Sequence, residues 1–291
     1  MSLFDAWAHT CGTMATGGFS TLQSSVGGFD SVYVDIIITL FMFLAGCNFI
    51  LHYRALRGRP LFYFKDDEFK LYLFVTCFAT FTIAASLMYS GSPIMTTSGK
   101  SVAPDLFKSI QYSAFQTTSI LTTTGFATAD FAIWPTYACL LLVILMFIGG
   151  CGGSTGGGMK NSRLLLLLKY STMQVKRCLF PRSVSNIQLN NVRIKSDTLH
   201  KVLSFFFLFV IIFVFFSLAL SLYPGIDYAT ATSASIASLG NIGPGLNKVG
   251  PTYTYSWMAP SAKLLLTFAM LLGRLEIYTV LIIFLPSFWR K

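Results

Sequence analysis

Five long apolar stretches, almost free of charge, constrain the fold of this chain more than any other feature. A membrane-spanning helix needs about 20 apolar residues. Four of the five stretches contain no charged residue, and the last contains Arg274 and Glu276. With 54% hydrophobic and 11% charged residues, the chain is predicted to be an all-α polytopic membrane protein, and a disordered chain is excluded. The five expected spans are Ile36–Leu51, Leu71–Tyr89, Tyr137–Met159, Val202–Leu222 and Leu264–Trp289.

The basic residues gather in a few segments and so predict the orientation of the chain. Sixteen of the 21 lie in His52–Lys70, in Lys160–Lys201 or at the C-terminus. By the positive-inside rule these parts face the cytoplasm, which predicts a multi-pass plasma-membrane protein with a cytoplasmic C-terminus. The formal net charge of +10 is then a topology signal, and no nucleic-acid partner is expected. The long basic loop Lys160–Lys201 is also a candidate docking site for a partner.

Three external segments share one pattern, which indicates an internal repeat. Each has an Asp at the head of a short helical run, and we expect Asp5, Asp105 and Asp227 to be helix N-caps. Each run ends in a Thr, Asn and Gly tract and leads into a span, as a re-entrant loop would. The helix C-terminus would then point to mid-membrane and favour a cation, while glycines would let carbonyl groups turn inward. Ordinary external turns remain the alternative.

A glycine-rich tract interrupts the third span. Seven of its ten residues are Gly, and each costs about 1 kcal/mol relative to Ala in a helix. We therefore expect a break in the helix, with a packing hinge as one explanation and a gate as the role that a family resemblance implies. A nucleotide-binding loop is disfavoured because Met159 stands where the phosphate-loop pattern requires Lys. The tract consists of Gly149, Gly150, Cys151, Gly152, Gly153, Ser154, Thr155, Gly156, Gly157 and Gly158.

At these motifs the chain resembles the Trk/Ktr/HKT superfamily of potassium transporters, and most closely its TrkH branch. The resemblance implies repeated membrane-pore-membrane units around a pore, with three of the family's four filter loops present here. It divides the chain into 1–60 (second repeat), 61–200 (third repeat, with the gating loop and the basic loop) and 201–291 (fourth repeat). A first repeat would then belong to the same or another chain. The matching stretches are Ala15–Thr21, Thr122–Asp130, Phe147–Lys160, Asn241–Gly245 and Gly273–Arg290.

The resemblance also implies roles for single residues. The filter glycines fall on Gly18, Gly125 and Gly243, and Arg274 would project into the permeation path beneath the filter. The alternative for Arg274 is a structural pair with Glu276 or with a nearby carbonyl group, although a spacing of two disfavours the Glu276 pair. Potassium would bind the filter residues Ala15, Thr16, Gly17, Gly18, Thr122, Thr123, Thr124, Gly125, Gly240, Asn241, Ile242 and Gly243.

The function implied is potassium uptake, with this chain as the ion-conducting subunit of a Trk-type system in a bacterial inner membrane. The implied partners are a second copy of the chain and a cytosolic ring of nucleotide-binding RCK (TrkA-type) subunits. ATP or NAD(H) would bind that ring, and no cofactor is expected in this chain. A non-conducting fragment, a sodium-permeable family member and a membrane enzyme are the alternatives. The enzyme is disfavoured because no nucleophile–base set or metal-ligand spacing is visible.

Overall fold

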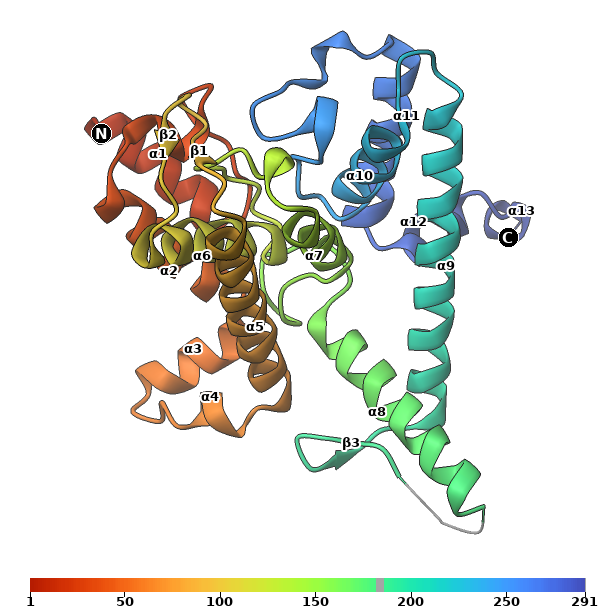
Figure 1. The fold of residues 1–291 in the computed structure, drawn as a ribbon. Coiled ribbons are helices and arrows are strands. Elements are labelled where there is room, and N and C mark those ends of the chain that lie inside the picture. Colours follow the sequence, from red (N-terminus) through yellow and green to blue (C-terminus); the bar gives the residue numbers. More distant parts are fainter. Residues whose placement is uncertain (182–185, 291) are drawn as a thin grey trace.

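The structure is a computed structural model that describes residues 1–181 and 186–290. It is built almost entirely of helices, as the sequence predicts (Figure 1). Within the described residues, two unbroken helices are long and apolar enough to cross a membrane, α5 (Asp67–Ser90) and α9 (Ser196–Ser221). Two further pairs of helices meet the same test only when each bent pair is taken as one span. The expectation of five spans is therefore only partly met.

The first expected span, Ile36–Leu51, is broken near its end. Helix α2 (Val32–Ala45) and helix α3 (Phe49–Leu56) meet at an angle of 102°. The cause is local, because the Asn48 side chain accepts a hydrogen bond of 2.9 Å from the Ile50 amide and starts a new helix. The backbone carbonyl of Gly46, in the break, accepts from the Cys151 amide at 2.8 Å.

The last expected span, Leu264–Trp289, is broken as well. Helix α11 (Pro260–Arg274) and helix α12 (Ile277–Ile283) meet at 115°, and the short α13 (Pro286–Trp289) follows. The chain turns at Glu276, which has a φ of 62°. Residues other than Gly and Asn rarely adopt this backbone conformation. Contacts made by Arg274 and Glu276, described below, hold this turn.

Three short helices, α1 (Leu3–Met14), α6 (Leu106–Leu121) and α10 (Tyr228–Leu239), each precede one of the repeated tracts. Asp105 and Asp227 lie at N-cap positions, as expected. The prediction for Asp5 was wrong: Ser2 is the N-cap, and Asp5 is the third helical residue of a capping box with it. Burial raises the pKa of Asp227, but hydrogen bonds from Thr230 and Asn247 outweigh this and lower it.

The third expected span, Tyr137–Met159, is helical only as α7 (Thr136–Phe147), and the glycine tract that follows is not helical, as predicted. The basic segment Lys160–Lys201 was expected to be a loop. Instead it contains helix α8 (Asn161–Leu179), a hairpin of β3 (Gln188–Leu189) and β4 (Val192–Arg193), and the start of α9. The remaining short elements are α4 (Phe62–Lys65), β1 (Ile94–Met95), β2 (Ser101–Val102) and the 3-10 helices Ser25–Phe29, Phe131–Ile133, Asn247–Val249 and Tyr255–Trp257.

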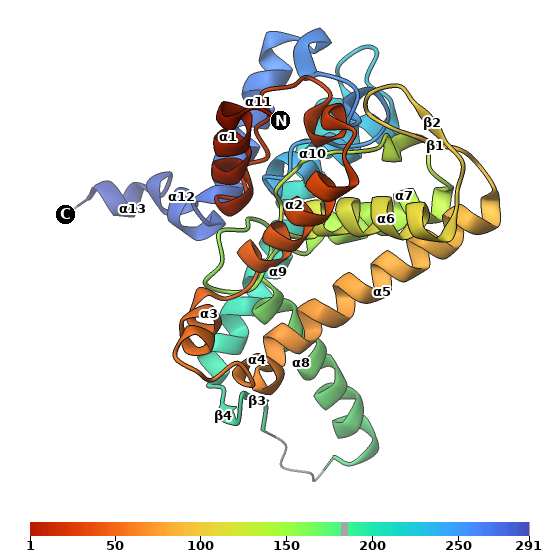
Figure 2. The ribbon, with the colours of Figure 1, turned by 90° about the vertical axis from the view of Figure 1, so that its left-hand side faces the viewer.

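The elements gather around the three short helices. Figure 1 places α1, α2 and α6 on one side, α9, α10 and α11 on the other, and α7 between them. Seen from the side in Figure 2, α5 runs diagonally below α6 and α7, and α8 descends away from them with the β3–β4 hairpin beside it. Buried Tyr72, Ile83 and Leu142 belong to one apolar cluster that joins the middle and C-terminal parts of the chain.

Candidate functional site: three filter turns and the glycine loop beneath them

The three repeated tracts fold into the same backbone turn. In each, the second residue after the helix has a left-handed conformation, with φ of 51° at Thr16, 59° at Thr123 and 58° at Asn241. Each turn also closes with an amide that donates to a carbonyl five residues earlier, at 2.8–2.9 Å. These donor–acceptor pairs are Gly17 with Gly12, Thr124 with Ser119, and Ile242 with Ala237. The alignment that the sequence predicted is therefore repeated in the backbone geometry.

The glycines of the three turns show how the turns lie relative to one another. Gly18, Gly125 and Gly243 have φ of 67°, 85° and 106°, a region open to Gly at little cost. A Cβ on Gly18 would lie 1.9 Å from the Thr124 carbonyl oxygen, and one on Gly125 would lie 2.0 Å from that of Ile242. Gly18 and Gly125 thus each face a carbonyl of the next turn, and the three turns follow one another around a shared space.

One side of this space is open. Among the described residues, no heavy atom lies within 4 Å of the position that a Cβ on Gly243 would take. Phe19 of the first turn is 82% exposed, whereas its counterpart Phe126 is completely buried. A cavity of about 560 Å³ is lined by residues of all three turns and by Arg274. The arrangement is an incomplete ring of turns around a cavity that has Arg274 in its wall.

The glycine tract lies directly against the inner ends of these turns. The Gly157 amide donates to Thr123 Oγ1 at 2.5 Å. A Cβ on Gly157 would lie 2.7 Å from the Gly240 carbonyl oxygen, so only glycine allows this close approach. The Thr155 hydroxyl donates to the carbonyl of Met14 at 3.2 Å. The tract therefore contacts the C-terminal end of α1 and the turns that follow α6 and α10, at Met14, Thr123 and Gly240.

Two charged residues of the α11–α12 turn hold the tract from the other side. Arg274 Nη1 donates to the Thr155 carbonyl at 3.1 Å, and Glu276 forms an ion pair with Arg163 at 2.7 Å. Arg274 is thus paired with a nearby carbonyl rather than with Glu276. Arg163 lies in the first turn of α8, so the two contacts join the C-terminal turn to the glycine tract and to the helix that follows it.

Three residues for which the sequence predicted no contact with the tract also shape it. Asn161 Nδ2 donates to the Gly149 carbonyl at 2.7 Å, and the Lys160 ammonium group donates to the Gly156 carbonyl. Glu68, at the start of α5, accepts from backbone amides of Gly152 and of Ser162. Lys160 was predicted to belong to the basic segment and to end the family-matching stretch Phe147–Lys160, without a contact to the tract. One feature of the sequence could have pointed to Glu68. The chain has only 11 acidic residues, and this one lies at the edge of an apolar span.

The comparisons with known proteins agree with this geometry. The family model described as "TrkH: Cation transport protein" matches residues 1–291, the whole chain. The chain belongs to the TrkH family. It is therefore a membrane protein of a cation-transport family, which favours transport over the enzyme alternative. The glycine tract supports the same conclusion. A phosphate-binding loop needs free backbone amides, whereas the amides of Gly152 and Gly157 already donate to Glu68 and Thr123.

Several potassium uptake proteins are similar over the full chain. The Trk system potassium uptake protein TrkH of Escherichia coli K12 is 38% identical over 292 residues, which cover 100% of this chain and 58% of that protein. The Trk system potassium uptake protein TrkG of the same strain is 33% identical to this chain, and the match covers 57% of the length of TrkG. The crystal structure of the potassium transporter TrkH from Vibrio parahaemolyticus matches with a TM-score of 0.88 and 37% identity, over 99% of this chain and 60% of that one. The chain thus spans somewhat more than half the length of these TrkH-family relatives.

Proposed function

We propose that this chain conducts potassium across the membrane as the ion-conducting subunit of a Trk-type system. The observation that carries the proposal is the set of three equivalent turns, in which Gly18 and Gly125 each face a carbonyl of the next turn. Rings of carbonyl groups can replace the hydration shell of an ion. The names of the relatives, potassium uptake proteins and a potassium transporter, support potassium as the ion.

In this proposal the filter residues are Ala15–Gly18, Thr122–Gly125 and Gly240–Gly243. Their backbone carbonyls would bind potassium at the ends of α1, α6 and α10, where the C-terminal dipole of each short helix favours a cation. The open side beside Gly243 requires a fourth turn, supplied by the same or another chain. The repeat boundaries 1–60, 61–200 and 201–291 follow from this scheme, with one turn in each part.

The glycine tract Gly149–Gly158 would then be the gate. It crosses beneath the turns and contacts Met14, Thr123 and the Gly240 region, so an ion that leaves the filter meets it next. Arg274 places a fixed positive charge at the same level, bound to the Thr155 carbonyl. Such a charge repels cations just below the filter and so lowers their occupancy there.

The partners and location follow from the same proposal. The chain would act as a homodimer in a bacterial inner membrane, with the basic segments and the C-terminus in the cytoplasm. A cytosolic RCK ring, which would bind ATP or NAD(H), would dock on the segment Lys160–Lys201. This segment supports the role because α8 begins directly after the gate tract and leads to the β3–β4 hairpin (Figure 1).

Ion flux into liposomes tests the proposal. The assembled transporter that contains this chain should carry potassium and should discriminate against sodium. Equal potassium and sodium fluxes would favour the sodium-permeable alternative. Absence of flux in the assembled transporter, with correct folding shown by size-exclusion chromatography, would favour a non-conducting role.

A further inference from the structure

A buried carboxylate lies against the glycine tract but belongs to a different helix. Glu68 is in the first turn of α5 and is only 7% exposed. Its Oε1 accepts hydrogen bonds from the Gly152 amide at 2.6 Å and from the Ser162 amide at 2.8 Å. The two donors are separated by the whole segment that contacts the filter turns, so one oxygen atom joins both ends of that segment.

The chemistry of this contact is favourable. Ser162 lies in the first turn of α8, where backbone amides have no partner within the helix. A negative charge at a helix N-terminus is stabilised by the helix dipole, and hydrogen bonds to a charged acceptor are stronger than neutral ones. Glu68 therefore takes the place that an anion would take at the start of α8. It also supplies a partner for the Gly152 amide.

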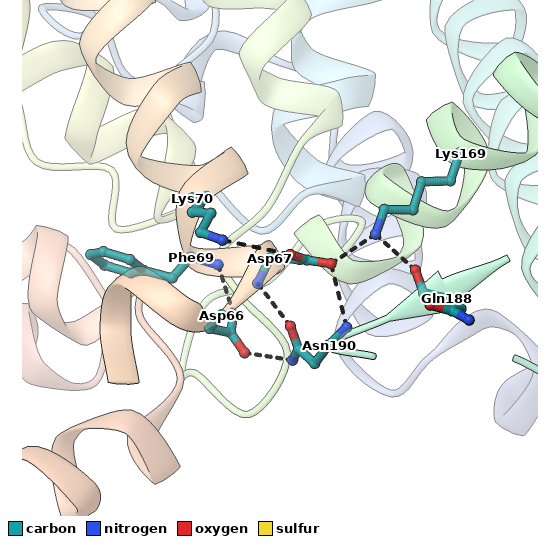
Figure 3. A network of polar contacts seen from close by, with 7 residues as sticks. All are labelled: Asp66, Asp67, Phe69, Lys70, Lys169, Gln188 and Asn190. Atoms are coloured by element: carbon teal, nitrogen blue, oxygen red, sulfur yellow. Dashed lines mark hydrogen bonds and ion pairs between the residues drawn. The ribbon is translucent and has the colours of Figure 1, made fainter. Parts of the chain in front are cut away.

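The helix turn that carries Glu68 is itself fixed. Figure 3 shows Asp67 close to Lys169 of α8 and to Asn190 of the hairpin, with Lys169 Nζ 2.8 Å from Asp67 Oδ2. Asp66 caps α5 by accepting from the Phe69 amide at 2.8 Å and also accepts from the Asn190 side chain at 2.7 Å. Three consecutive acidic residues thus hold the start of α5. Asp66 and Asp67 bind α8 and the β3–β4 hairpin, and Glu68 binds the glycine tract.

We propose that Glu68 is a positioning residue that holds the gate in its closed arrangement by binding the amides of Gly152 and Ser162, on either side of the segment that contacts the filter turns. The inference rests on the proposed role of Gly149–Gly158 as the gate. Opening requires the tract to leave the filter turns, and the two hydrogen bonds to Glu68 Oε1 oppose that movement. Without them the closed arrangement is less favoured, and the pore is open for a larger share of the time.

The test compares three variants of the assembled transporter in liposomes, without the regulatory ring. Glu68→Ala removes the acceptor for both amides and should raise basal potassium flux by about ten-fold, because the two hydrogen bonds to a charged acceptor that oppose opening are lost. Glu68→Gln keeps an oxygen acceptor at the same place and should stay close to wild type. Asp105→Asn, a control at an exposed acid at the N-cap of α6 that makes no side-chain cap hydrogen bond, should leave the flux unchanged.

A further variant tests the same contact if Glu68→Ala does not fold. Ser162→Pro removes one of the two amides and leaves Glu68 intact, and proline is tolerated in the first turn of a helix. It should raise basal flux less than the loss of both bonds. In all variants the ratio of potassium to sodium flux should stay at the wild-type value, because the filter turns are untouched.

The outcomes separate this inference from the gate itself. If a shortened glycine tract leaks and both Glu68→Ala and Ser162→Pro keep wild-type flux, the role of Glu68 is refuted and the gate stands. Equal leaks in Glu68→Ala and Glu68→Gln would also refute it, because the acceptor would not matter. If the shortened tract does not leak, the gate proposal is wrong. In the shortened tract, Glu68→Ala should add no further flux.

Discussion

The guanidinium group of Arg274 donates a hydrogen bond of 3.1 Å to the backbone carbonyl of Thr155. These residues are 119 positions apart in the sequence, and the contact joins the end of α11 to the middle of the glycine tract. The same Thr155 donates through its hydroxyl to the Met14 carbonyl at the end of α1. One residue of the tract therefore links the first pore helix to the last bent helix pair.

Replacing Arg274 separates the effect of this bond from that of the charge. Arg274→Gln keeps a donor group and loses the positive charge, whereas Arg274→Ala loses both. We expect both to raise potassium flux, because cation occupancy beneath the filter increases, and the alanine variant should leak more. Flux into liposomes at two salt concentrations is the measurement. Equal fluxes in the two variants would show that the bond to Thr155 has no part in holding the tract.

Gly125 offers a test of the filter. Its φ is 85°, and a Cβ there would lie 2.0 Å from the Ile242 carbonyl oxygen. Gly125→Ser should therefore displace the neighbouring carbonyl and weaken the discrimination of potassium from sodium. Gly91→Ser is the matched control, since Gly91 also has a positive φ, of 63°, but has no heavy atom of the described chain within 4 Å of its Cβ position. A wild-type ratio of fluxes in Gly125→Ser would contradict the filter assignment.

Thr123 connects the filter to the tract through its side chain. Thr123→Val keeps the shape but removes the oxygen that accepts from the Gly157 amide. A buried amide left without a partner costs about 1–3 kcal/mol, so the tract should bind less firmly and basal flux should rise. Thr124→Val is the control, because the Thr124 hydroxyl pairs with that of Thr122. Unchanged flux in Thr123→Val would argue against this contact as part of the closed gate.

The repeated turns were predictable because each depends on local sequence. A short helix followed by a Thr, Asn or Gly tract carries its own signal, and Gly18, Gly125 and Gly243 could be aligned by inspection. The glycine tract was predictable for the same reason, since seven glycines in ten residues disfavour a helix wherever they occur. Local patterns of this kind place the site but do not show what holds it.

The helix bends, and the long-range contacts that hold the glycine tract, could not be predicted from the sequence. Apolar content is the same in a straight helix and in a bent pair, so hydropathy did not show the turns at Asn48 and Glu276. Glu68 and Gly152 are 84 positions apart, and Arg163 and Glu276 are 113 apart. Contacts at such separations depend on how the helices pack. Asp5 was misplaced because Ser2 supplies a better cap three residues earlier.

The β3–β4 hairpin, which follows α8 in the chain, provides a test of partner docking. Replacing residues 188–193 with a Gly-Ser linker of equal length removes β3 and β4 and the contacts of Asn190 with Asp66 and Asp67. We expect the cytosolic ring to be lost on co-purification of the transporter. Asp197→Asn, outside the hairpin, should retain it. Full retention of the ring by the linker variant would place the docking site elsewhere.

Potassium flux through a shortened glycine tract tests the central claim most directly. Deleting about three residues of 152–158 in the assembled transporter, without the ring, should open the pore constitutively, because the tract can no longer reach Thr123 and the Gly240 carbonyl. The ratio of potassium to sodium flux should remain that of wild type, since the filter turns are intact. Replacing the same residues with alanine favours a continuous helix and should give a similar leak. Wild-type or lower flux in both variants would contradict the account and make the tract a packing hinge.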